Sequence, residues 1–170
     1  MKKILFVTAF ILISCGNNDT IPTAKQYSIE DIHNHQNFYW YQEEYNKYIY
    51  DSIILDTIAN KFNKYELKII IYTFPNCGCR GSLAVKFPQI IKVLDSSNIF
   101  KNNYEIFVIS NVEENNLNFK HPYSNIIEVT TLPAIYLIKL DTLYYNLLLQ
   151  VNTKKISIEQ ALLDGLKFFE

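Results

Sequence analysis

The chain has 170 residues, of which 49% are hydrophobic, and a formal net charge of −1. This length suffices for one domain with a buried core and some additional segments. The near-neutral charge excludes the strongly basic proteins that bind nucleic acid through their net charge, so we expect no nucleic-acid partner.

The first twenty residues have the features of a targeting segment. Two lysines precede the apolar run Ile4–Ile13, which is too short to span a bilayer as a stable helix. The run ends in Ser14-Cys15-Gly16, which resembles a bacterial lipoprotein signal. We therefore expect a signal peptide over residues 1–15 that ends at a lipidated Cys15, with the chain anchored to the bacterial cell envelope and facing the periplasm or the cell exterior. The alternative is a plain secretion signal in which Cys15 is incidental; in both cases disulfides can form in the mature domain.

Residues 16–27 are polar and predict a flexible tether, and residues 28–66 predict an N-terminal helical extension. Ser28 is placed to cap a first helix. Asp51 or Ser52 is placed to cap a later helix, which is predicted over residues 51–64. Between them, four aromatic residues recur at helical spacing and predict a helix: Phe38, Tyr41, Tyr45 and Tyr48. This stripe is expected to pack against the domain, or alternatively to dock a partner.

A buried strand is predicted at Leu67–Tyr72, and an amphipathic helix at Ser82–Leu94. Cys77 and Cys79 therefore lie where a strand gives way to a helix. The unpaired N–H groups and the dipole of a helix N-terminus stabilise a thiolate, which is the reactive form of cysteine. Arg80 adds a positive charge beside the two thiols.

The rest of the chain predicts further strands and a closing helix. Tyr104–Ser110 is an apolar strand that follows a helix, which implies a parallel crossover to the first strand. Residues 111–128 are polar and irregular and predict a loop with a short helix. Pro133 then opens an apolar strand that runs to Ile138. A turn leads to a further strand predicted over residues 142–151, and Ser157 is placed to cap a final amphipathic helix.

This order of elements resembles the thioredoxin fold, and more narrowly the TlpA/ResA-type membrane-anchored thiol-disulfide oxidoreductases. The resemblance covers Leu67 to Glu170 and depends on Phe74–Arg80, on Thr131–Ala134 and on the terminal hairpin and helix. It implies an α/β fold class: a thioredoxin-like three-layer α/β/α arrangement with a mixed central sheet, following the helical extension. It also implies that Pro133 is cis beside the cysteines, and that Leu132 helps to hold the substrate.

The chain departs from the family pattern in its Cys-Gly-Cys spacing. Asn76 stands where the family has tryptophan, and the first strand has isoleucines where the family often has a buried acid. A bridge between Cys77 and Cys79 closes almost no loop, so it would stabilise the fold little. Its tight ring is expected to be strained, which makes a disulfide more oxidising than that of thioredoxin.

The predicted activity is thiol-disulfide exchange, as oxidoreductase or isomerase, with protein thiols or disulfides of the envelope as partners. Cys77, Cys79 and Pro133 are the expected catalytic residues, and Leu132, Gly78 and Arg80 the expected substrate-binding residues. No cofactor or metal is expected. Two alternatives stay open: a redox-inactive thioredoxin-like binding module, and a Cu(I) site built from both thiolates with His121.

Overall fold

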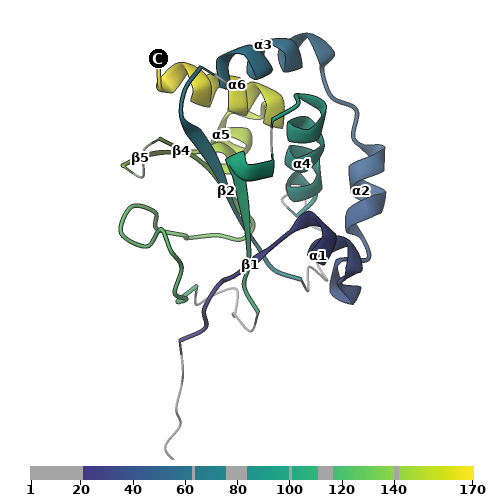
Figure 1. Ribbon diagram of the computed structural model, residues 1–170, viewed down its shortest axis with the longest axis vertical. Coiled ribbons are helices and arrows are strands. Elements are labelled where there is room, and N and C mark those ends of the chain that lie inside the picture. Colours follow the sequence, from purple (N-terminus) through teal and green to yellow (C-terminus); the bar gives the residue numbers. More distant parts are fainter. Residues whose placement is uncertain (1–20, 63, 76–83, 100, 111–116, 140–141) are drawn as a thin grey trace, which may run out of the picture.

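The central strand of the protein is β2, Leu67–Thr73, an apolar and β-branched segment in a computed structural model (Figure 1). β3 (Tyr104–Val108) pairs with β2 in parallel on one side, and β4 (Ala134–Lys139) pairs antiparallel on the other. The edge strands β1 (Lys25–Tyr27) and β5 (Leu143–Asn146) pair antiparallel with β3 and β4. The sheet is therefore mixed and five-stranded, in the order β1-β3-β2-β4-β5.

The structure describes residues 21–62, 64–75, 84–99, 101–110, 117–139 and 142–170. The predicted signal peptide with Cys15 and the segment that contains Cys77, Gly78, Cys79 and Arg80 lie outside these residues. Within the described ranges, no helix combines the length and the apolar character needed to cross a membrane.

One face of the sheet is covered by helices. Side chains of a strand alternate between its two faces. On one face of β2, Ile69 and Ile71 belong to a hydrophobic core. This core also contains buried apolar residues from each described helix of six residues or more. In Figure 1 these helices gather on one side of β2. They are α1 (Ile29–Asn34), α2 (Tyr41–Lys47), α3 (Ser52–Phe62), α4 (Lys86–Ser96), α5 (Leu147–Lys154) and α6 (Ile158–Phe168).

The other face of the sheet is covered by the segment 117–133. Ile70 and Tyr72 of β2 form a second core with Phe119, Ile127 and Val129 from this segment. The segment contains turns and one isolated bridge, without a helix or a strand of the sheet. The fold class predicted from the sequence is confirmed: the protein is α/β, with a mixed sheet between two outer layers, compatible with a thioredoxin-like fold.

The N-terminal helical extension packs on the helical layer, with α2 against α4 and α3 against α6. The aromatic stripe of the extension faces inward, because Phe38 and Tyr41 are buried with their ring centroids 6.1 and 5.3 Å from that of Phe87. The predicted packing role of these two residues is confirmed. The predicted cap is also present, since the Ser28 hydroxyl accepts the N–H of Asp31 in a capping box.

A buried carboxylate ties the extension to the last helix. Glu159 of α6 is 1% exposed, and its two oxygens accept the Tyr48 hydroxyl at 2.5 Å and the Asp51 N–H at 3.2 Å. Both donors lie in the connection between α2 and α3. A buried carboxylate must be satisfied by such donors to be tolerated, so this contact fixes the path of the extension over the domain.

Two segments differ from the sequence-based expectation. The strand predicted over 142–151 ends at Asn146, whose side chain accepts the N–H of Leu149 and so caps α5. Leu147, Leu148 and Val151 are apolar in a spacing that fits a helix as well as a strand, and packing of α5 against α6 and β4 selects the helix. The expected tether ends in β1, which has little apolar character because it is an edge strand held by backbone pairing to β3.

The pairing register places three chain segments at one end of the sheet. Val108, at the end of β3, lies opposite both Lys25 and Thr73, so β1 begins where β2 ends. Tyr72 lies opposite Ala134, so β4 also begins there. The amino-terminal segment therefore joins the domain at the carboxyl end of β2, which is the end that leads to the cysteines.

The Glu159 contact predicts the effect of a truncation. Glu159→Ala leaves the hydroxyl of the half-buried Tyr48 and the Asp51 N–H without their acceptor, so we expect the free energy of unfolding to fall by about 2–4 kcal/mol. Urea denaturation measures this change. The matched control is Glu66→Ala at an exposed position, which should change stability by less than about 0.5 kcal/mol. Equal effects of the two substitutions would contradict the structural role of Glu159.

Candidate functional site

The predicted reactive segment begins at the carboxyl end of β2. Thr73, the last residue of β2, is 3% exposed, and its carbonyl accepts the N–H of Ile109 at 2.9 Å. Pro75 is also buried, and the described chain resumes at Ala84, just before α4. The cysteines and their neighbours Gly78 and Arg80 lie outside the described residues, so the structure gives the surroundings of this segment: two buried flanks that lead from β2 into α4.

Pro133 lies beside the end of β2. The peptide bond between Leu132 and Pro133 is cis, as the family resemblance implied, and Pro133 is buried whereas Leu132 is half-buried. Tyr72 is paired with Ala134, the first residue of β4, so Pro133 directly precedes the last printed pair at the end of β2. The structure thus brings the predicted catalytic proline next to the strand end from which the cysteine segment starts.

A charged side chain lies at the start of α4. Lys86 is half-buried and its Nζ donates to Oε1 of Gln89 at 2.9 Å. Burial lowers the pKa of Lys86, and the negative charge of Glu159 partly opposes this effect. α4 begins at Lys86 and extends to Ser96, later than the predicted helix over 82–94. Lys86 therefore places a positively charged side chain in the first turn of α4.

His121 lies on the opposite face of the sheet, in the layer formed by 117–133. Its Nδ1 is 2.7 Å from the hydroxyl of Tyr72, and its ring meets the edge of the Tyr72 ring at a centroid distance of 5.0 Å. Burial lowers the pKa of His121 and raises the pKa of Tyr72, so both groups are held in their neutral forms. This pair joins the irregular layer to the central strand.

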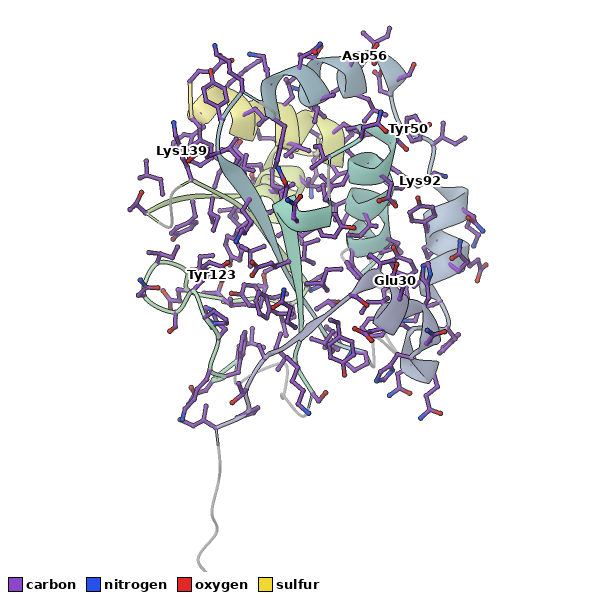
Figure 2. The ribbon with its side chains drawn as sticks, in the orientation of Figure 1. Glu30, Tyr50, Asp56, Lys92, Tyr123 and Lys139 are labelled. Atoms are coloured by element: carbon purple, nitrogen blue, oxygen red, sulfur yellow. The ribbon has the colours of Figure 1, made fainter. Side chains whose placement is uncertain are left out.

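A second polar contact crosses from the same layer to the sheet. Glu105 of β3 accepts Nζ of Lys68 at 2.8 Å on one carboxylate oxygen and the hydroxyl of Tyr123 at 2.9 Å on the other. Figure 2 shows Tyr123 on the side of the sheet away from Lys92 of α4. Tyr123 is thereby held over the sheet although its segment contributes no strand.

The other histidines take part in packing and capping. The ring of His33 lies 5.2 Å from that of Tyr41, and Nδ1 of His35 accepts the N–H of Asn37 at 3.2 Å. Among the described residues, no group of three or more His, Cys, Asp or Glu side chains is arranged to hold a metal ion. Their place at the start of the extension gives His33 and His35 local structural roles.

Two features of the surroundings were not found from the sequence. One is a buried acid, Glu159 of α6; its signal in the sequence is a charge next to Ile158 on the apolar face of a predicted helix. The other is a pocket in the layer formed by 117–133. The polar composition of residues 111–128 predicted a loop with a short helix, and their described part, 117–128, forms no helix. A pocket depends on how the chain is folded over the sheet, which composition does not indicate.

Comparisons of the chain with protein families, with curated proteins and with solved structures found no match.

The neutral state of His121 predicts a pH dependence of stability. Since its pKa is lower in the folded than in the unfolded state, the unfolded chain binds more protons below about pH 6.5, and stability is lost as the pH falls through the folded pKa. His121→Gln removes this linkage. We expect its free energy of unfolding, measured in urea, to decrease less than that of the wild type between about pH 7.5 and pH 5.

Tyr72→Phe is the matched control, because it removes the hydrogen bond and keeps the titrating ring. It should lower stability at neutral pH while the loss on acidification persists. The same pH dependence in the wild type and in His121→Gln would show that another group is responsible.

Proposed function

We propose that the protein is an envelope-tethered thiol-disulfide exchange protein, an oxidoreductase or isomerase, that uses Cys77 and Cys79. The observation that carries this proposal is the register of β2 and β4, in which Tyr72, next to the end of β2, is paired with Ala134, the residue that follows Pro133. Cys77 follows Pro75 by two residues, and successive Cα atoms are about 3.8 Å apart. This short connection supports a position for the first cysteine near the end of the sheet at which Pro133 lies.

The positive charges near this end favour a thiolate. Arg80 follows the second cysteine directly in the sequence, and Lys86 is the first residue of α4. A nearby cation and a helix N-terminus both stabilise a negative sulfur and lower the pKa of a thiol. These groups support Cys77 as the attacking residue, because thiolate rather than thiol is the nucleophile.

The proposed reaction takes place in two exchange steps. The Cys77 thiolate attacks one sulfur of a substrate disulfide, whose S–S bond breaks and releases the other sulfur as a thiolate. The Cys79 thiolate then attacks the Cys77 sulfur of the mixed disulfide and releases the second substrate thiolate. The substrate gains two electrons and the Cys77–Cys79 pair loses two, so a further thiol of the envelope must reduce the pair. Run in reverse, the same steps oxidise a substrate dithiol.

The geometry of β1 supports a site that faces the membrane. Cys15, the proposed lipidated residue, precedes Ile21 by six residues, and six residues span at most about 21 Å. The chain from Ile21 enters the sheet at the carboxyl end of β2, where the N–H of Ala24 bonds to the carbonyl of Lys120 at 2.8 Å. A lipid anchor at Cys15 would thus hold the proposed cysteine site close to the bilayer, within reach of thiols or disulfides of other membrane-attached proteins.

The role of the two cysteines is tested by trapping. Cys79→Ser removes the sulfur that resolves the mixed disulfide, so this variant should accumulate covalent adducts with envelope proteins. Non-reducing electrophoresis of the purified variant detects them, and a reductant should release them. The matched control is Cys77→Ser, which lacks the attacking sulfur and should capture far less.

Two other results would favour the alternative functions, a redox-inactive binding module or a Cu(I) site. Absence of adducts, together with absence of insulin reduction by the wild type, would assign the protein to the redox-inactive binding modules. One equivalent of copper in protein purified under reducing conditions, lost in His121→Gln, would favour the Cu(I) site.

The anchor is tested by Cys15→Ser. If Cys15 is lipidated, the wild type should sediment with membranes and extract into detergent, and the variant should lose this association because it has no acyl chains. Cell fractionation with an antibody against the chain measures the distribution. Ser14→Ala keeps a small residue before the cysteine and serves as the control. Equal sedimentation of all three proteins would contradict lipidation at Cys15.

A further inference from the structure

The layer formed by 117–133 contains a pocket of about 450 Å³. It lies between this segment and Tyr144 of β5, on the face of the sheet opposite to α4. Its volume is in the range of small-molecule sites, about 300–1,000 Å³. The pocket thus lies on the face of the sheet opposite to the helix that follows the proposed cysteine site. It is lined by Leu117, Asn118, Phe119, His121, Ser124, Asn125, Ile126, Ile127, Glu128, Val129 and Tyr144.

The polar part of the lining is almost uncharged. Asn118, Ser124 and Asn125 offer amide and hydroxyl groups that both donate and accept hydrogen bonds. The ring of His121 is held in place by its contact with Tyr72 and is neutral near pH 7. Glu128 supplies one carboxylate, and none of the lining residues that the structure describes is a lysine or an arginine. This set suits a ligand with several hydroxyl groups and disfavours an anion.

The apolar part of the lining includes an aromatic ring at its margin. Tyr144 is 43% exposed, and its ring packs edge-on against that of Tyr136 at a centroid distance of 5.7 Å. The Tyr136 hydroxyl donates to the carbonyl of Glu128 at 3.1 Å, which joins both sides of the pocket. Phe119, Ile127 and Val129 form a buried apolar floor. Such surfaces can bury the C–H faces of a sugar ring while its hydroxyls bond to amides.

The wall of the pocket is held in shape by backbone hydrogen bonds. The N–H groups of Ile126 and Ile127 donate to the carbonyl of Tyr123 at 3.0 and 2.8 Å. Lys120 bonds through its backbone to both Pro22 and Ala24, each at 2.8 Å. A wall ordered in advance lowers the entropic cost of binding.

We propose that this pocket binds a neutral saccharide unit. The uncharged side chains can both donate hydrogen bonds to neighbouring sugar hydroxyls and accept hydrogen bonds from them. The ring of Tyr144 at the rim can pack against the apolar face of a sugar ring. Among the described lining residues, a polyamine would find its only carboxylate in Glu128, and a sugar phosphate would meet that carboxylate without a compensating cation. The proposal does not depend on the redox chemistry of the cysteines.

The test is an NMR titration of the full chain in detergent micelles. The neutral probes are glucose, N-acetylglucosamine and their β-1,4-linked disaccharides; spermidine and glucose 6-phosphate are the cationic and anionic probes. We expect at least one neutral saccharide to bind with shifts confined to the pocket residues, and more tightly than either charged probe. Asn125→Ala and Tyr144→Ala should each weaken that binding at least tenfold.

Matched controls on the helical side of the chain are Asn152→Ala and Tyr39→Ala, both at exposed positions. They should leave the affinity unchanged, and the double variant with Cys77→Ser and Cys79→Ser should bind as the wild type does. The proposal is overturned if no neutral saccharide binds, if a charged probe binds more tightly, or if the controls weaken binding as much as the pocket variants. Thermal melting of each variant identifies any that fail to fold, and the second pocket variant then decides.

Discussion

The fold depends on the burial of both faces of β2. Ile69 and Ile71 on one face and Ile70 and Tyr72 on the other are all fully buried, and each such side chain contributes about 1.5–3 kcal/mol when it leaves water. A strand that is apolar on both faces requires a cover on each. The helices supply one cover, and the segment 117–133 supplies the other without forming a helix in its described residues.

β2 connects two regions of interest: the strand end that leads to the cysteine segment, and the pocket in the layer formed by 117–133. The carboxyl end of the strand leads to the cysteine segment and lies beside Pro133, and α4 returns from that segment over the helical face. On the opposite face, Tyr72 reaches His121 at the edge of a polar pocket. The charged residues near the two regions also differ: Lys86 and Glu159 lie on the helical side, whereas Glu128 is the carboxylate among the described lining residues of the pocket.

The sequence predicts the elements that local patterns define. β2, β3 and β4 are continuous apolar runs, and α1 and α6 begin at serine caps, so each was found close to its observed position. β1 was missed because its pairing with β3 joins residues about eighty positions apart and needs no apolar side chain. α5 was assigned to a strand because Leu147–Val151 fits two periods. The polar contacts of Tyr48 with Glu159 and of Tyr72 with His121 also join distant segments, and no local pattern indicates them.

The direction of β1 determines how the protein responds to mechanical load at its amino terminus. β1 is antiparallel to β3 and continues from Ile21 at the end of the sheet, so a pull on that end acts along the strand axis. Such a force shears the pairs Lys25–Val108, Gln26–Phe107 and Tyr27–Ile106 together, instead of opening them one after another. The bridge between Thr23 and Lys120 extends the resistance toward the terminus. A short edge strand can in this way withstand tension that would peel it away if its chain entered from the side.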